Sequence, residues 1–460
     1  MSIASYLDAH GLDTKILDQA RQRTFWDSLG RELADAEYVG LSVMTTQIPN
    51  ALKVTREIKK NNPNVKIIWG GIHPTLFPRE TLAEPLIDFV VYGEGEVPLL
   101  KLIRGVSMAE IKGLGYKHDT KCITNPPGEL FDLNELPVYN WNLLPQEILE
   151  KMSLVPLAMS RGCPHRCAFC INTITKNKWR SMSLPKIIEN LRLVKKSPYL
   201  RGKYASFSFE ENFFVNKERV KEICKAIISE SLLVEWEAPC RADYIREGFV
   251  DDELLTLLKR AGLRRMGIGA ESGSNRVLAL IKKDLTAEQT IYANQKLAEH
   301  GISPYYGFMV GLPGETWDDV IATLNLIDRI KKDNPQAEIM GPQPFRLYPG
   351  SELYNECINL GWKSPKSLNE WKKVINEELN YLNMKNYPWV KNPAVIEAID
   401  AYARFGSNSF RQAMALGVSA PRIFKFLFAV ICKIRWKLRF FRFPYEYLLA
   451  KKLVTLFSRN

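Results

Sequence analysis

This sequence lacks a second group of closely spaced cysteines, a signal-like start and any long apolar run. Structural zinc usually needs four ligands from two Cys or His pairs, and the chain has no second CxxC or CxxH pair near its one cysteine cluster. Residues 1–5 open no charged and apolar signal segment, so we expect a cytoplasmic chain in which disulfides are rare. The scattered cysteines are expected to be ordinary small apolar residues: Cys122, Cys224, Cys240, Cys357 and Cys432.

The composition is that of a folded protein with more than one domain. Of the 460 residues, 46% are hydrophobic and 25% are charged. A chain of this length and balance predicts two or three globular domains with substantial cores, and it does not indicate disorder.

Positive charge is concentrated in the last 40 residues. The formal net charge is +12, but residues 421–460 carry ten Lys or Arg against the single acid Glu446, a local +9 that leaves only +3 for the rest. This tail is also rich in aromatic residues. Its longest uncharged stretch, residues 426–432, has seven residues, against the roughly 20 that a membrane-spanning helix needs.

Three interpretations of the tail stay open. Cations interleaved with aromatic residues suit a helix lying in the headgroup layer of an anionic membrane, at its inner face. A basic aromatic surface could also hold nucleic acid, which we consider the weaker interpretation. The third is a C-terminal helix packed on the body with its charges solvated.

Three cysteines lie within eight residues. Cys163, Cys167 and Cys170 are separated by gaps of three and two residues. Three soft ligands so close together indicate one metal centre, and a cubane iron-sulfur cluster needs four ligands, so one iron would stay open. Structural zinc, a disulfide and unrelated buried thiols are the alternatives.

The CxxxCxxC spacing resembles that of the radical S-adenosylmethionine (SAM) enzymes. The resemblance implies a 4Fe-4S cluster whose open iron binds the amino and carboxylate groups of SAM. It also implies that a reductant such as a flavodoxin or ferredoxin supplies one electron, which splits SAM into a 5′-deoxyadenosyl radical. The cofactors would carry the chemistry and the protein would orient them.

Residues 14–100 alternate strand-like and helix-like segments, which predicts a Rossmann-like parallel α/β sheet. Glycine-rich turns follow its last two strands, where an open parallel sheet binds ligands. A helix is expected over 50–60, and a loop leading into a shorter helix over 74–84. The expected strands are 14–18, 38–44, 65–69 and 89–92.

The segments "VKIIWGGIHPTLFP" and "IDFVVYGEGEVPLLKLI" together resemble the cobalamin-binding domain found in one large radical SAM subfamily. Compared with that domain, the chain lacks a first strand and a DxHxxG motif. The histidine beside the Gly-Gly turn is not assigned as a cobalt ligand. The resemblance implies cobalamin binding by Gly70, Gly71, His73, Gly93, Glu94 and Gly95.

From residue 153 the alternation resumes and resembles the partial (β/α)6 barrel of radical SAM enzymes. The cysteine loop follows the first expected strand, and in such barrels the chemistry lies at the carboxyl ends of the strands. The expected strands are 155–159, 205–209, 235–239, 265–269, 303–310 and 338–345.

The same resemblance implies the residues that would bind SAM. Glu210 or Glu211 would meet its ammonium group, and Arg241 its carboxylate. The block 267–274 would contact the ribose and methionine, and strand 303–310 would lie beside the adenine. The full expected set is Phe169, Glu210, Glu211, Arg241, Glu271, Ser272, Gly307 and Gly311. Of Tyr305 and Tyr306, neighbours on a strand, one must point inward, as a candidate catalytic residue.

The expected organisation is a cobalamin-binding-like domain (1–110), a connector (111–152), the barrel (153–355), a helical region (356–420) and the basic aromatic tail (421–460). The resemblance predicts cobalamin-dependent methylation of an unactivated carbon. The basic aromatic tail motivates the hypothesis that the substrate is lipid-like or membrane-borne. The alternative within enzymes is radical oxidation, cyclisation or rearrangement of a lipid-like or tetrapyrrole substrate, with cobalamin bound but not delivering methyl. A non-catalytic cobalamin or SAM sensor is the alternative of another class.

Overall fold

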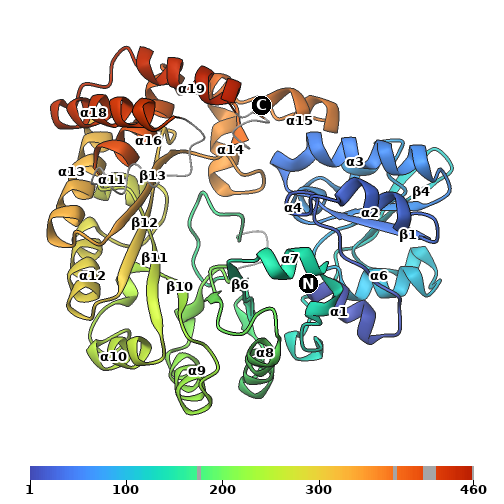
Figure 1. The fold of residues 1–460 in the computed structure, drawn as a ribbon. Coiled ribbons are helices and arrows are strands. Elements are labelled where there is room, and N and C mark those ends of the chain that lie inside the picture. Colours follow the sequence, from blue (N-terminus) through green and yellow to red (C-terminus); the bar gives the residue numbers. More distant parts are fainter. Residues whose placement is uncertain (173–177, 377–380, 408–420, 458–460) are drawn as a thin grey trace. The chain divides into compact units, whose positions relative to one another are not determined.

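The computed structural model describes residues 1–172, 178–376, 381–407 and 421–457 (Figure 1). The chain divides into two compact units. Unit 1 contains residues 1–153, 180–201 and 363–383, and unit 2 contains residues 154–179, 202–362 and 384–460.

Unit 1 is built on a sheet with the order β1-β2-β3-β4-β5, of which β1, β2 and β3 are parallel. The buried side chains of Ile67, Ile68 and Trp69 explain why β2 lies in the middle of this part. The strands are β1 (Tyr38–Ser42), β2 (Lys66–Gly70), β3 (Phe89–Val91), β4 (Leu114–His118) and β5 (Lys121–Thr124). Unit 1 also contains α1 (Ser2–Ala9), α2 (Phe25–Glu32), α3 (Ile48–Asn61), α4 (Ile72–Leu76), α5 (Pro78–Leu82), α6 (Glu96–Ile103), α7 (Gln146–Lys151), α8 (Leu184–Lys196) and α15 (Leu368–Val374), with the short strands β8 (Arg180–Ser181), β14 (Ile375–Asn376) and β15 (Tyr381–Leu382).

The strand expected over 14–18 was wrong. This segment is irregular, and the backbone N–H of Ile16 donates to Leu143 instead of joining the sheet. The Thr14 hydroxyl donates to the carbonyl of Leu12, a local bond of the kind that competes with a strand.

Sequence reasoning missed a hairpin inside the expected connector. Strands β4 and β5 pair antiparallel, and β4 also pairs antiparallel with β3. The turn between them places Asp119 at φ 53°, a left-handed conformation that Asp tolerates better than most residues. Residues 114–124 therefore complete the sheet of unit 1.

Unit 2 is built on a curved sheet with the order β13-β12-β11-β10-β9-β6, in which all neighbours are parallel. The six expected barrel strands are confirmed. Helices α9, α10, α12 and α13 cover the outer face of this sheet (Figure 1). The strands are β6 (Leu154–Pro156), β9 (Tyr204–Ser206), β10 (Trp236–Cys240), β11 (Leu263–Glu271), β12 (Ser303–Val310) and β13 (Glu338–Pro344), and the short strand β7 (Ser160–Arg161) precedes the cysteine loop.

Burial alternates along β12, from half-buried to buried at every step. Tyr306 and Phe308 are buried on the side of α12, where the Tyr306 hydroxyl donates to Asn294. Burial of each such side chain adds about 1.5–3 kcal/mol to the free energy of unfolding. The other residues of β12 therefore face the concave side. The helices of unit 2 are α9 (Lys217–Glu230), α10 (Asp252–Arg260), α11 (Asn275–Leu280), α12 (Ala287–Glu299), α13 (Trp317–Asp333), α14 (Glu352–Asn359), α16 (Pro393–Gly406), α18 (Arg422–Leu438) and α19 (Tyr445–Phe457).

The basic tail forms α18 and α19, and both pack against α16. The Trp436 indole donates to Asp328 of α13 at 2.7 Å, and Arg439 pairs with the same carboxylate. The tail is therefore part of unit 2. Among the described residues, no helix is both long and apolar enough to cross a membrane.

Candidate functional site

The cysteine loop is anchored to the barrel by backbone hydrogen bonds. The N–H of Ala168 donates to Ile281, and its carbonyl accepts from Leu353, both at 2.8 Å. Cys167 is buried, whereas Cys163 and Cys170 are half-buried. Burial raises the pKa of both Cys167 and Cys170, the latter to about 11. Metal binding here would have to displace thiol protons.

Two buried cations lie beside Cys167. The Arg241 guanidinium is 3.9 Å from its sulfur, and it also binds Asp243 and the carbonyl of Lys283. Burial opposes the charge of Lys283, but Glu271 and the Cys167 thiol outweigh this effect and raise its pKa. Both cations favour negative charge at the loop.

Glu271 occupies a strained place at the end of β11. Its φ of 64° lies in the left-handed region, which a non-glycine residue rarely adopts and which occurs often at functional sites. The carboxylate pairs with Lys283 at 2.8 Å. A Cβ at Gly269 would lie 2.9 Å from the Lys283 ammonium, so the glycine makes room for this pair. The ammonium also lies 5.8 Å from the ring centroid of Phe169.

A polar group on the other side of the loop was not predicted. Asn212 lies 3.7 Å from the Cys163 sulfur and 3.2 Å from the Tyr244 hydroxyl, which is 2.7 Å from His165. Burial, with Arg241 adding to it, lowers the pKa of His165 to about 4, so this imidazole is neutral near pH 7. The position of His165 between two of the cysteines was the available sequence signal.

The two glutamates expected near SAM have different surroundings. Glu210 is fully buried, where it accepts from the Met159 N–H and from Ser160 and pairs with Arg219. Glu211 is exposed and accepts from the N–H of Gly162, at the start of the cysteine loop. Glu210 thus serves the packing of the strand ends, and Glu211 is the acid that borders the loop.

Tyr305, and not Tyr306, faces the concave side of the barrel. Its ring lies against Gly267, where a Cβ would come within 2.8 Å of it, and the Arg265 guanidinium is 4.8 Å from the ring centroid. The hydroxyl lies 2.8 Å from that of Ser208. Tyr306 is a core residue.

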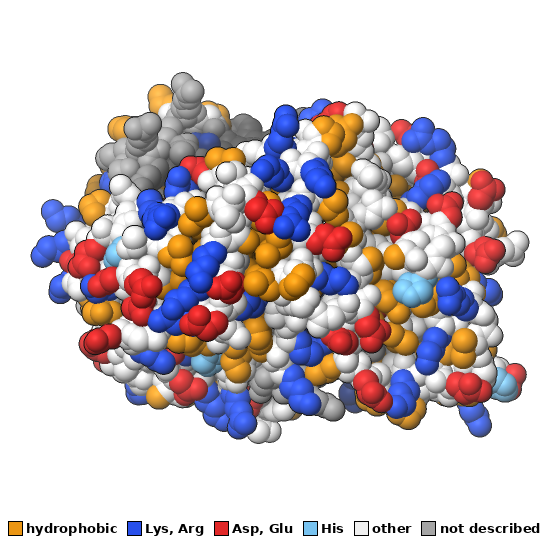
Figure 2. Space-filling view, turned by 90° about the horizontal axis from the view of Figure 1, so that it is seen from below, with side chains coloured by type: hydrophobic (Ala, Val, Ile, Leu, Met, Phe, Trp, Pro, Cys, Tyr) orange, Lys and Arg blue, Asp and Glu red, His pale blue; other side chains and the backbone are white. Residues whose placement is uncertain are grey.

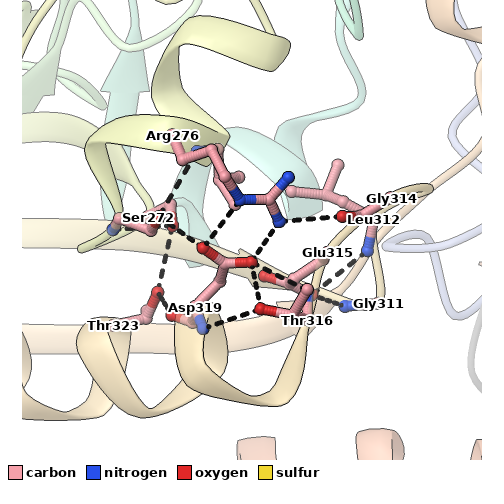
Figure 3. Close-up of polar contacts among 11 residues, drawn as sticks. Ser272, Arg276, Gly311, Leu312, Gly314, Glu315, Thr316, Asp319 and Thr323 are labelled. Carbon is pink, nitrogen blue, oxygen red and sulfur yellow. Dashed lines mark hydrogen bonds and ion pairs between the residues drawn. The ribbon is translucent and has the colours of Figure 1, made fainter.

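The glycine-rich blocks 267–274 and 307–315 meet around α13 (Figure 3). Ser272 is fully buried and lies 3.1 Å from the Thr323 hydroxyl. Asp319 accepts from Ser274 and from Thr316, the N-cap residue of α13, and pairs with Arg276. Ser272 is therefore part of the helix-sheet packing.

Glu315 closes the second block. It accepts from the N–H groups of Gly311 and Leu312, as Figure 3 shows, and burial raises its pKa to about 7. Gly311 has φ 82°, and a Cβ there would lie 2.9 Å from Met384. Gly307, in contrast, has open space on its Cβ side.

The residues of the loop suit an iron-sulfur cluster by their chemistry. Three thiols share one loop, and Arg241 and Lys283 beside Cys167 would offset the negative charge of a thiolate-bound cluster. Within the part of the chain that the structure describes, no three His, Cys, Asp or Glu side chains are gathered as a metal site. Ligation by the three cysteines stays a prediction.

In unit 1 the loops after the three parallel strands are bonded to one another. The N–H of Val43 donates to Gly70, the N–H of His73 donates to Val43, and the N–H of Gly93 donates to the Thr75 hydroxyl. These loops therefore form one edge, at the carboxyl ends of β1, β2 and β3, where open parallel sheets bind ligands.

This edge has the features of a binding surface for a large flat ligand. Met44 and Ile72 expose 45% and 38% of their surface on two of the loops. Gly71 has φ 91°, and a Cβ there would lie 2.8 Å from the Val43 nitrogen. Gly93 has φ 80° with open space beside it. The apolar side chains and close backbone fit a corrin ring.

The other residues expected to bind cobalamin are buried, paired or part of a helix start within unit 1. His73 is fully buried between the rings of Phe77 and Trp371, and burial lowers its pKa to about 3. Glu94 pairs with Arg180, while Gly95 precedes α6. His73 is thus buried within unit 1, and its part in cobalamin binding stays a prediction.

Two family models match the chain in this order. Residues 1–103 match the B12 binding domain, and residues 157–327 match the radical SAM superfamily. The chain belongs to the radical SAM superfamily, among the members that carry a B12-binding domain. It is an enzyme whose domains imply an iron-sulfur cluster, SAM and cobalamin as cofactors.

Curated relatives match most of the chain. An uncharacterized methyltransferase of Pyrococcus horikoshii is 29% identical over 82% of this chain and 83% of its own length. The anaerobic magnesium-protoporphyrin IX monomethyl ester cyclase of Rubrivivax gelatinosus is 27% identical over 77% of this chain and 65% of its own length.

Solved structures share the fold. The radical SAM methyltransferase TsrM from Kitasatospora setae, with cobalamin and a [4Fe-4S] cluster bound, has a TM-score of 0.69 at 17% identity, covering 99% of this chain and 96% of that one. The cobalamin-dependent SAM radical enzyme OxsB also has a TM-score of 0.69, at 16% identity, covering 95% of this chain and 76% of that one.

Proposed function

We propose that this chain is a cobalamin-dependent radical SAM methyltransferase that methylates an unactivated carbon. When bound, the cluster and SAM would supply a 5′-deoxyadenosyl radical, and cobalamin would supply the methyl group. The observation that carries the proposal is the CxxxCxxC loop with Arg241 and Lys283 at Cys167.

The residues of the barrel would bind and orient SAM. Glu211 borders the cysteine loop and would accept from the SAM ammonium group, and Arg241 offers a forked cation to its carboxylate. Glu271, held by Lys283, would accept from the ribose hydroxyls. Tyr305, on the concave face of β12, would form one wall of the space for the substrate.

The edge of unit 1 supports the cobalamin dependence of the proposed reaction. The exposed Met44 and Ile72 beside Gly71 and Gly93 suit cobalamin, the group that would carry the methyl. A relative named as a methyltransferase matches more than four-fifths of both chains. We expect the substrate to be a small or lipid-like molecule.

The test uses the full chain, purified without oxygen and reconstituted with iron, sulfide and cobalamin. After reduction with dithionite, we expect 5′-deoxyadenosine from SAM. An organic extract of the source cells is added as the supply of substrate. With methyl-labelled SAM, the label should enter cobalamin and then a compound of that extract. Cys167→Ala should abolish 5′-deoxyadenosine formation, whereas Cys224→Ala, a buried cysteine outside the loop, should retain it.

The outcomes separate the alternatives. Formation of 5′-deoxyadenosine with no label in any extracted product would favour oxidation or cyclisation over methyl transfer. If reduced protein with full iron content left SAM intact, catalysis would be refuted in favour of a sensor role.

A further inference from the structure

Helix α18 carries an exposed apolar stripe along its length. Ile423, Leu427, Ile431, Ile434 and Leu438 recur every three or four residues, so they share one face. Ile423 and Leu438 expose 74% and 68% of their surface, and the other three side chains are also exposed. A continuous exposed stripe of five aliphatic residues marks an interaction surface.

The packing of the opposite face fixes which side of α18 is turned outward. Phe428, Ala429, Cys432 and Trp436 are buried on the inner side of the helix, which packs against α16. The Trp436 indole bond to Asp328 anchors the end of the helix. The stripe is therefore presented by a fixed helix, at the edge of unit 2 where Figure 1 shows α18 and α19.

Further exposed apolar side chains follow the end of α18 in the chain. The turn and the first part of α19 add side chains that are all exposed: Phe440, Phe443, Tyr445, Leu448 and Leu449. We call the stripe and these residues together the C-terminal patch. Its mixture of aliphatic and aromatic side chains is that of surfaces at a membrane interface.

Cations accompany this patch. Lys437 lies on one flank of the stripe, and both Lys437 and Arg442 are exposed. Other basic residues of the tail are used internally, because Arg435 pairs with Glu446 and Lys451 with Glu397. The face in Figure 2, in contrast, shows acidic and basic side chains interspersed.

We propose that the C-terminal patch docks on the surface of an anionic lipid bilayer, with the aliphatic side chains among the acyl chains and Lys437 and Arg442 against lipid phosphates. A nucleic acid would bind aromatic side chains by stacking and basic side chains by its phosphates, but it offers no apolar layer for five Ile and Leu side chains. A second copy would bring the same cations together across a two-fold interface. This surface is independent of the chemistry proposed for the barrel.

The experiment measures binding of the full chain to sedimented vesicles. We expect binding to vesicles of phosphatidylcholine with phosphatidylglycerol, weaker binding at high salt, and weak binding to phosphatidylcholine alone. Leu427→Ser/Leu438→Ser and Lys437→Glu/Arg442→Glu should each lower the affinity roughly tenfold or more. Ile358→Ser/Leu360→Ser, which alters two exposed residues at the end of α14, should bind as the unsubstituted chain does.

Thermal unfolding of each variant checks that the fold is kept. The proposal is overturned if both patch variants fold and still bind anionic vesicles as tightly as the control. It is also overturned if the unsubstituted chain does not bind anionic vesicles and instead binds a labelled oligonucleotide. The same holds if it does not bind vesicles and instead forms a dimer that the Leu427→Ser/Leu438→Ser variant cannot form.

Discussion

Glu315 shows how one buried carboxyl couples the barrel to pH. Its oxygen atoms lie within the turn that it closes, and it accepts the N–H groups of Gly311 and Leu312. Burial raises its pKa from 4.5 to about 7 because the charged form loses its water there. In the folded state this carboxyl therefore holds its proton at pH values where the unfolded chain has lost it.

The first prediction concerns this group. Below pH 4.5 Glu315 is protonated in both states, so its contribution to the free energy of unfolding is fully present. As the pH rises from 4.5 through 7 that contribution is lost. Glu315→Gln keeps an acceptor oxygen and should flatten this part of the pH dependence, raising the free energy of unfolding at pH 8 by on the order of 2 kcal/mol. Chemical denaturation between pH 4 and 8 measures it, and an unchanged slope would contradict the assignment.

At the scale of elements, the close approach of α13 to the end of β11 holds the two glycine-rich blocks together. A Cβ at Gly273 would lie 2.7 Å from the Thr323 Cα, which belongs to the helix backbone and cannot turn away. The Gly273 N–H also donates to the Thr323 hydroxyl. The helix therefore lies where it does because residue 273 has no side chain.

The second prediction follows from this contact. Gly273→Ala should lower the free energy of unfolding by about 1–3 kcal/mol, because the helix must move away from the strand end. Gly30→Ala is the control, since Gly30 is exposed in α2 with open space at its Cβ position. That change should be neutral or stabilise by up to about 1 kcal/mol. Equal effects of the two substitutions would refute the packing argument.

At the scale of the whole molecule, the residues expected to hold each cofactor belong to different units. The cysteine loop lies in unit 2, and the three loops of the expected cobalamin edge lie in unit 1. Each unit has its own sheet and buried core. Loss of one cofactor site should therefore leave the other unit folded.

The third prediction is a separation of the two cofactors in purified protein. Cys163→Ala/Cys167→Ala/Cys170→Ala should lose iron and its visible absorbance but retain cobalamin. Gly71→Ala should do the reverse, because the new Cβ would meet the Val43 nitrogen at a strained φ. Metal analysis and absorption spectra measure both. If the triple variant lost cobalamin in equal proportion, independent binding would be wrong.

Local sequence determined the parallel sheet of unit 2, the three parallel strands of unit 1 and the presence of three thiols in one loop. Alternation of strand-like and helix-like segments, short apolar runs and cysteine spacing are local properties, so they can be recognised without a structure. The tertiary structure alone decided that 14–18 is not a strand, that Tyr305 and not Tyr306 faces inward, and that Glu210 is buried while Glu211 borders the loop. It also placed Arg241 and Lys283 at Cys167 and turned the apolar side of α18 outward. These facts depend on contacts between residues far apart in the chain, and such contacts exist only once the strands and helices have packed.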